Sequence, residues 1–151
     1  MGLLRFNKRP PFALREGVLA ELWRAKLFGE QPSVHRLELA KKLNYDYVHD
    51  SSVFVCLDKC RQDGLVAEPV PDTFEIRKEG FFWLCDSLNR SERLDNLPKP
   101  GSILITRYTD ERKKRAEAIH AGWLQEWMAR RDKQAREIAT QITNRLVASG
   151  P

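Results

Sequence analysis

The chain has 151 residues, of which 42% are hydrophobic and 31% are charged. This length allows one ordinary core, or one small domain with an appendage. No apolar run reaches the roughly 18 residues that a membrane helix needs, so we expect no membrane span. The three cysteines lack the even number and spacing of a disulfide framework, which favours a reducing, cytoplasmic or nucleoid-associated location.

The net charge of +5 is distributed unevenly along the chain. Residues 1–30 carry +3, residues 31–90 carry −2 and residues 91–151 carry +4. A basic surplus attracts polyanions such as nucleic acids, but here it lies on either side of the central segment. We therefore expect any electrostatic attraction for DNA to come largely from the flanks.

A basic lead-in over residues 1–11 precedes the first predicted helix, which extends from Phe12 to Gly29. Apolar residues recur in this segment at helical spacing, and glycine is a favourable residue at a helix end. Trp23 widens the apolar surface, so we expect it in the core; contact with a second subunit is the alternative. The stripe itself consists of Leu14, Val18, Leu22 and Ala25.

Two short helices are predicted next. The first extends from Ser33, which can cap it, to Asn44, and the second extends from Ser51 to Gly64. Residues 45–50 between them are either an N-terminal extension of the second helix or a looser connection. The inward residues, read from helical spacing, are Val34, Leu37, Ala40 and Leu43 in the first helix and Val53, Cys56, Leu57 and Cys60 in the second.

A hairpin and a fourth helix follow. Residues 65–68 and 73–77 alternate apolar and polar side chains around a Pro-Val-Pro-Asp turn, which is typical of paired strands. A helix then starts at Lys78. Trp83 lies almost opposite the apolar stripe of this helix, so we expect another part of the chain or another subunit to cover it. The stripe consists of Phe81, Leu84, Cys85 and Leu88.

The succession of helix, helix and hairpin resembles a winged helix-turn-helix domain over residues 12–88. The pattern that carries the resemblance is Leu39-Ala40-Lys41-Lys42-Leu43, then residues 51–66 ending in Gly-Leu-Val, then residues 74–80. With a long C-terminal helix added, the arrangement is similar to the PadR and MarR groups of transcriptional regulators. The resemblance implies a mainly α fold with a small β-hairpin wing, a homodimer and binding to double-stranded DNA.

Residues 89–105 are predicted to be a linker, in which Leu94 and Leu97 are candidate anchors. Residues 106–149 contain no proline and are predicted to form a long C-terminal helix. If continuous, this helix is some 60 Å long at 1.5 Å per residue, so it must extend beyond a small domain. A kink or break within residues 129–133 is the alternative, because the apolar stripe changes direction there.

The C-terminal helix is predicted to have two apolar faces. The second face keeps mostly the three- and four-residue spacing of a coiled-coil seam, interrupted only at Arg131. A helix with two apolar faces and no domain beneath half of it is best explained by a second copy of the chain. The predicted dimerisation residues are Trp123, Leu124, Trp127, Met128, Ala135, Ile138, Ile142 and Leu146.

The second short helix is the predicted DNA-reading helix. Serine and glutamine can bond to base edges, but Asp58 repels phosphate and no arginine is available for guanine. The hairpin turn also lacks Lys and Arg. We therefore expect DNA affinity to come mainly from phosphate contacts, with weak discrimination between sequences. The predicted nucleic-acid-binding residues are His35, Arg36, Lys41, Lys42, Tyr47, His49, Ser51, Ser52, Val55, Lys59 and Gln62.

A protein-interaction role is the alternative to DNA binding. Winged helices also serve as adaptor or assembly modules, and a central segment with net negative charge is compatible with that role. The residues Tyr45 and Tyr47 lie between the two short helices. Packing of these tyrosines against the first of the two helices is the alternative to contact with phosphate.

The sequence gives little support to two further classes of site, a metal or thiol site and a catalytic site. A thiol sensor or zinc site could combine Cys56 and Cys60 with His49 or His120, but both thiols lie on the core stripe and no second pair accompanies them. We therefore predict structural cysteines, no metal and no cofactor. The sequence contains no phosphate loop and no supported nucleophile or carboxylate set, so we predict that the chain is not an enzyme.

Overall fold

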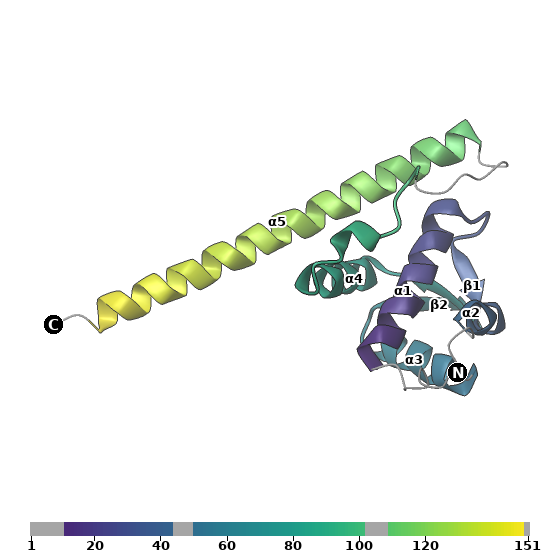
Figure 1. Cartoon of the computed structure of the whole chain (residues 1–151), viewed down its shortest axis with the longest axis horizontal. Coiled ribbons are helices and arrows are strands. Elements are labelled where there is room, and N and C mark those ends of the chain that lie inside the picture. The colour runs from purple at the N-terminus through teal and green to yellow at the C-terminus, as the bar shows by residue number, and fades with distance from the viewer. Residues whose placement is uncertain (1–10, 44–49, 102–108, 150–151) are drawn as a thin grey trace, which may run out of the picture.

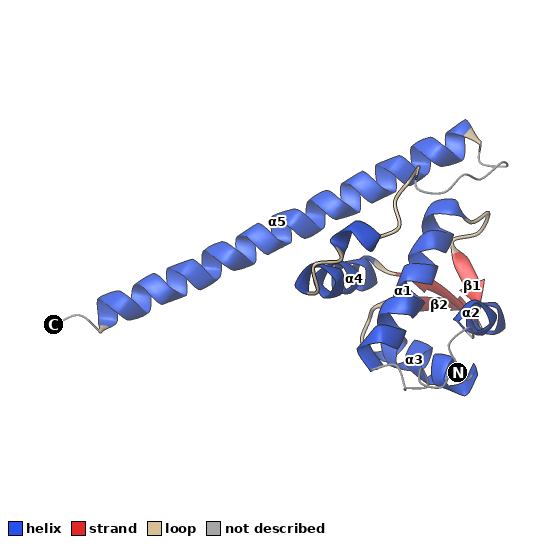
Figure 2. Cartoon of the chain, in the orientation of Figure 1, coloured by secondary structure: helices blue, strands red, loops and turns tan. Residues whose placement is uncertain are grey.

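The computed structural model describes residues 11–43, 50–101 and 109–149. These residues are mainly helical, with a small antiparallel sheet and one long C-terminal helix, as the sequence predicts (Figure 1). Figure 2 shows the strands together on one side of the helical body. The elements are α1 (Pro11–Phe28), β1 (Ser33–His35), α2 (Arg36–Leu43), α3 (Asp50–Gln62), β2 (Val66–Val70), β3 (Thr73–Ile76), α4 (Lys78–Arg90), a 3-10 helix (Leu94–Asn96) and α5 (Asp110–Ala148).

The sheet has three antiparallel strands in the order β1-β3-β2. On the central strand β3, Phe74 lies opposite Val34 of β1, and Ile76 lies opposite Val66 of β2. All four side chains are buried, because alternate residues of a strand point to the same face. The turn between β2 and β3 includes Asp72 at φ 67°, the left-handed conformation that tight hairpins require. The predicted hairpin is thereby confirmed.

The strand β1 corrects one prediction. Ser33 to His35 were expected to open a helix with Ser33 as its cap, but they pair with β3, and the helix starts at Arg36. The β-branched Val34 suits the buried side of a sheet, and the pairing opposite Phe74 outweighs the local helix signal. A strand of three residues gives too short a pattern to be recognised without its partner.

The later start of α2 also changes its inward face. Leu37 was expected to point inward but is 52% exposed, and Leu39 is buried instead. On α3, Cys56 was placed on the core stripe but is only half-buried at its edge. The other predicted inward residues of the two helices are buried, namely Ala40, Leu43, Val53, Leu57 and Cys60. Gly64 ends the α3 region at φ 77°, as expected.

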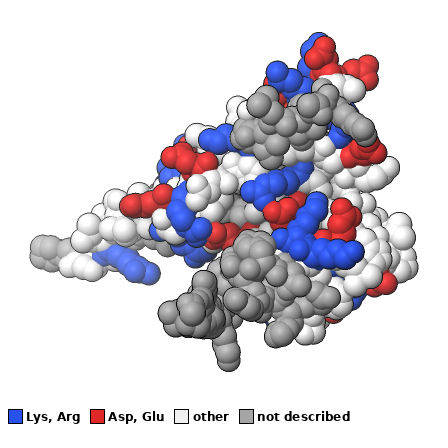
Figure 3. Space-filling view, turned by 45° about the vertical axis from the view of Figure 1, so that its right-hand side comes forward, with Lys and Arg blue, Asp and Glu red and all other residues white. Residues whose placement is uncertain are grey.

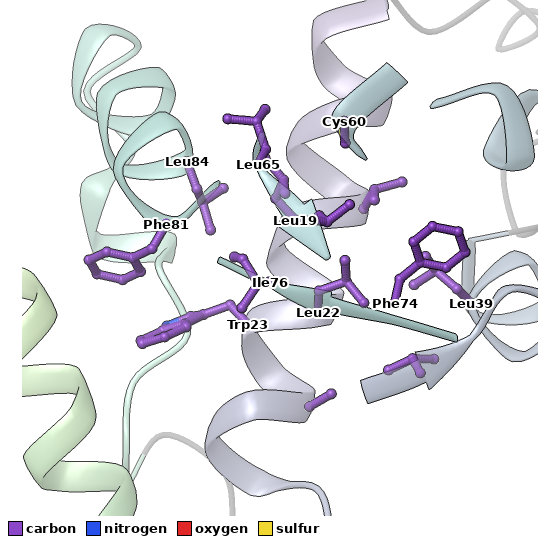
Figure 4. Packing of buried hydrophobic residues seen from close by; sticks show 14 of the residues in the cluster. Leu19, Leu22, Trp23, Leu39, Cys60, Leu65, Phe74, Ile76, Phe81 and Leu84 are labelled. Atoms are coloured by element: carbon purple, nitrogen blue, oxygen red, sulfur yellow. The ribbon is translucent and has the colours of Figure 1, made fainter. Parts of the chain in front are cut away.

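The helix α1 lies at the centre of the core and contacts the other helices and the sheet. Figure 4 shows Leu19, Leu22 and Trp23 of α1 extending toward side chains from the sheet and from α4. Trp23 is fully buried, and its ring centroid lies 4.4 Å from that of Phe81 on α4. Trp23 is therefore a core residue, as predicted.

The α4 helix and the segment after it are packed onto this core. The predicted inward stripe of α4 is buried, and the Arg15 guanidinium lies 5.4 Å from the Trp83 ring centroid, so α1 covers this tryptophan. Leu97 is buried, and the Trp23 Nε1–H donates a hydrogen bond of 2.8 Å to the Pro98 carbonyl. Leu97 therefore anchors the segment that follows α4 to the core, as predicted.

The α5 helix is continuous over its 39 residues, so the alternative of a kink or break within residues 129–133 is excluded. The Thr109 hydroxyl caps its start by accepting a hydrogen bond from the Arg112 amide. The first half of α5 lies against α1 and α4, whereas residues 131–149 are all exposed and project from the body (Figure 1). None of the helices in the described ranges combines the length and hydropathy of a membrane span.

Candidate nucleic-acid interface

The α3 helix has a buried face and an exposed face. Val53, Leu57 and Cys60 are buried against the core, which fixes the rotation of the helix about its axis. The opposite face is open to solvent, and its apolar member Val55 is 68% exposed. This exposed face contains all five predicted contact residues of the helix, Ser51, Ser52, Val55, Lys59 and Gln62.

Arg36, one of the predicted contact residues, has a guanidinium that is engaged within the chain. Its Nε lies 2.9 Å from Asp72 Oδ1, at an angle that makes an ion pair rather than an aligned hydrogen bond. Its Nη2 lies 3.8 Å from Glu68 Oε2 and 4.0 Å from Asp58 Oδ1. With its side chain only 22% exposed and three carboxylates around it, Arg36 is poorly placed to bind phosphate.

The Arg36 side chain instead connects α2, α3 and the hairpin. Its guanidinium lies 5.2 Å from the Phe54 ring centroid and 5.4 Å from that of Phe74. The Arg36 amide also donates a hydrogen bond of 2.8 Å to the Asp72 carbonyl in the turn. The positive charge near Asp58 offsets part of the phosphate repulsion expected from that carboxylate.

The two lysines of α2 lie at its C-terminal end. Lys41 and Lys42 are both exposed, and Lys42 Nζ lies 3.8 Å from Glu38 Oε1. Such exposed pairs contribute little energy, so the Lys42 ammonium group can exchange this partner for a phosphate. His35 is exposed, and its Nδ1 accepts a hydrogen bond from the Leu37 amide. The predicted contacts Tyr47 and His49 lie outside the described residues.

Charges of both signs are mixed on the surface of the body. Figure 3 shows Lys and Arg side chains next to Asp and Glu on the visible face, rather than a patch of one sign. Around the hairpin, Arg36 and Arg61 are each within 4.0 Å of the Glu68 carboxylate. Mixed charge of this kind gives weaker long-range attraction for a polyanion than a continuous basic surface.

Two of the predicted dimerisation residues belong to the core of the single chain. Trp127 is 2% exposed, and its Nε1–H donates a hydrogen bond of 2.9 Å to Asp86 Oδ1 on α4. Trp123 is partly buried, with its ring centroid 5.3 Å from that of Trp23. The first apolar face of α5 therefore packs on its own body, and Trp127 is not available to a second copy.

The second apolar face of α5 remains open. Leu124 is partly buried against the core, but the positions that follow along this face are exposed. Met128 and Ile142 are each 52% exposed, Ile138 is 56% exposed and Leu146 is 70% exposed. We use the name distal seam for the part of this face on the projecting half of α5, which consists of Ala135, Ile138, Ile142 and Leu146.

The cysteines differ in their surroundings. Cys60 and Cys85 are buried, whereas Cys56 is half-buried. A hydrogen bond with Cys60 lowers the pKa of the Cys56 thiol, and the same hydrogen bond together with burial raises the pKa of Cys60. Burial raises the pKa of Cys85 to about 12. Within the described ranges, no group of three or more His, Cys, Asp and Glu residues could hold a metal ion.

The structure exposes two separate candidate binding surfaces. One consists of the outward face of α3 and the exposed lysines Lys41 and Lys42 of α2, and the other is the distal seam of α5. The first surface is mainly polar, and the second is mainly apolar. No protein-family model, no curated protein and no solved structure matches this chain.

Proposed function

We propose that this chain is a dimeric DNA-binding protein, built on a winged helix-turn-helix domain of the PadR or MarR type and acting in transcription regulation. The observation that carries the proposal is the outward face of α3, which is mainly polar and exposed; the helix α2, which packs against α3, carries the exposed lysines Lys41 and Lys42. The order of α2, α3 and the β2–β3 hairpin agrees with what the resemblance implies. The proposed role is binding without catalysis or cofactor, in the cytoplasm or on the nucleoid.

In this proposal α3 lies in the major groove, where a helix fits with its exposed face toward the base edges. Lys41, Lys42 and Lys59 contact phosphates on either side. Arg36 contributes indirectly, by holding the hairpin to α2 and by offsetting the charge of Asp58. Since phosphate contacts carry no sequence information, the protein is proposed to bind different DNA sequences with similar affinity.

The dimer is proposed to form through α5. The distal seam exposes Ile138, Ile142 and Leu146 on the projecting half of α5, which no other described part of the chain covers. Burying such a side chain contributes roughly 1.5–3 kcal/mol, so three per copy give a substantial driving force. A dimer also presents two α3 helices to DNA, which strengthens binding of the whole protein through effective concentration.

The DNA proposal is tested by removing the two lysines of α2. The variant Lys41→Gln with Lys42→Gln is titrated with random duplex DNA over a range of salt concentrations. We expect weaker binding and a slope of log K against log salt that is flatter by about 0.9 for each lost contact. The matched control is Lys113→Gln with Lys114→Gln, which removes the same charge from the start of α5, at the far end of the body from α3 (Figure 1). An equal loss in both variants would contradict a specific role of this surface.

A second titration tests discrimination between sequences. Ser51→Ala with Gln62→Ala removes the polar groups of α3 that can reach base edges. We expect similar affinities for random DNA and for any preferred site. Loss of binding to a preferred site alone would show that α3 reads bases.

An adaptor role is the second candidate function, favoured by exposed apolar side chains near the same surface. Leu37 of α2 is 52% exposed, Val55 of α3 is 68% exposed and Val70 of β2 is 58% exposed. Apolar residues of this kind suit a protein partner better than a phosphate backbone. If no duplex DNA binds even at low salt, the adaptor role replaces DNA binding.

A further inference from the structure

We infer that two copies of this chain pair antiparallel through the distal seam, with Ala135 of one copy opposite Leu146 of the other. This inference rests on the dimer in the proposed function and specifies its geometry. The occupant of the exposed α5 face is thus a second α5, running in the opposite direction.

The projecting half of α5 has the properties of a helix that pairs with another helix. Its apolar positions Ala135, Ile138, Ile142 and Leu146 are three or four residues apart and lie on one side of the helix. Arg145 is the only Lys, Arg, Asp or Glu residue between Ile138 and Ser149. A partner surface that is itself apolar and nearly uncharged, such as a second copy, matches this face best.

Arg131 determines the direction of pairing. In a parallel pair each residue meets its own copy, so the two Arg131 residues, each with its guanidinium 5.0 Å from the Trp127 ring centroid of its own chain, would meet beside the seam, next to Arg130, Asp132 and Lys133. The positive charges of the two copies would then repel each other. In an antiparallel pair, Arg131 instead lies beside the last turn of the partner α5, which ends at Ala148. The carbonyl groups of that turn carry partial negative charge and favour an arginine.

Side-chain size supports the same direction. With a two-fold axis between Thr140 and Gln141, each Ala135 lies opposite a Leu146, and each Ile138 lies within one residue of the position opposite an Ile142. A small residue then faces a large one at both ends of the seam, which fills space evenly. A parallel pair would place alanine opposite alanine and leave a gap in that layer. An alternative antiparallel register has its two-fold axis at Ala135. This register would cover Met128, but it would bury Arg131 of one copy against Ile138 of the other.

The pairing places the two bodies at opposite ends of the dimer. The docked part of α5 is centred near Ala121 and the two-fold axis lies near Thr140, so the bodies are about 60 Å apart along the helix at 1.5 Å per residue. Half-sites one helical turn apart on DNA are separated by only about 34–36 Å. The two α3 helices are therefore expected to engage two separate segments of DNA rather than adjacent turns of one site.

The test is disulfide cross-linking between two co-expressed variants of the full chain that each add one cysteine, Ala135→Cys in one copy and Leu146→Cys in the other, distinguished by a tag on one copy. Antiparallel pairing in the inferred register brings these two positions within disulfide range. We expect a cross-linked hetero-pair after mild oxidation, and little cross-linking of either variant alone. The parent chain, with Cys60 and Cys85 buried and Cys56 half-buried, is the control.

Two results would overturn the inference. Efficient self-cross-linking of Ala135→Cys would indicate a parallel pair or the shifted register centred on Ala135. A monomeric mass with no covalent hetero-pair would exclude pairing through this seam. Because no DNA is present, the outcome is independent of the proposed DNA binding: hetero-pair cross-links in a protein that binds no duplex contradict only the DNA proposal.

Discussion

Cys56 and Cys60 lie one helical turn apart on α3, yet only Cys60 is fully buried. This burial supports a packing role, so we predict that Cys56→Ala with Cys60→Ala lowers the free energy of unfolding by about 1–3 kcal/mol, as small core truncations do. Urea unfolding measures this loss. DNA affinity should be unchanged, because neither thiol belongs to the proposed contact set. Loss of a bound metal or of a redox-dependent response in this variant would refute the packing role.

His120 on α5 is expected to make the stability of the folded state depend on pH. Its ring centroid lies 6.3 Å from that of Trp23, and among the described residues its buried Nε2 has no hydrogen-bond partner. Burial, and then the nearby Lys99 ammonium, lower the pKa of His120 in the folded state. The unfolded state therefore takes up this proton first, and stability is lost as the pH falls below about 6.5.

We predict that His120→Gln reduces the loss of stability between pH 7.5 and pH 5.5 relative to the parent chain. Unfolding midpoints of both proteins at the two pH values provide the measurement. Identical pH profiles for the parent and His120→Gln would show that His120 does not contribute.

At the scale of elements, Trp127 attaches α5 to the body. Trp127→Ala removes a 2%-exposed ring and the donor to Asp86 Oδ1, so we predict a destabilisation of about 3–5 kcal/mol and faster amide exchange in the first half of α5. The control is Met128→Ala, at the next position, whose side chain is 52% exposed and should matter little to a single chain. Equal effects of the two substitutions would contradict the docking of α5 through Trp127.

The helices α1, α3, α4 and α5 could be predicted from the sequence because each is long enough for its apolar spacing to be recognised. The helix α2 has only 8 residues, and its start and the position of Leu37 were predicted wrongly. The strand β1 could not be predicted, since Val34 fits a helix stripe as well as a strand and only its pairing opposite Phe74 decides. The two faces of α5 were also visible in the sequence. Which of them would dock on the body was not, because that depends on where α1 and α4 place Trp23 and Asp86.

The candidate site was predictable to a similar degree. The exposed face of α3 follows from the burial of Val53 and Leu57, so the residues exposed on it could be named in advance. The ion pairs of Arg36 could not be predicted, because its carboxylate partners come from α3, from β2 and from the hairpin turn, and they converge only in the fold. A sequence shows that a basic residue is present, but it does not show which distant acids neutralise it.

At the scale of the whole molecule, we predict that the distal seam holds the dimer together. Ile138→Asp with Ile142→Asp places two charges in the seam and should yield a folded monomer in sedimentation. The control, Thr140→Asp with Asn144→Asp, adds the same charges to the opposite side of α5 and should leave a dimer. An unchanged mass for the seam variant would place the interface elsewhere.

The proposed DNA binding is tested most directly by titrating the unmodified protein with random duplex DNA at several salt concentrations. Contacts from Lys41, Lys42 and Lys59 of one body predict that log K falls linearly with log salt, with a slope of about −2.7 at roughly 0.9 per phosphate. Competition with other random sequences should change K little. Absence of binding at low salt, or an affinity independent of salt, would contradict the account.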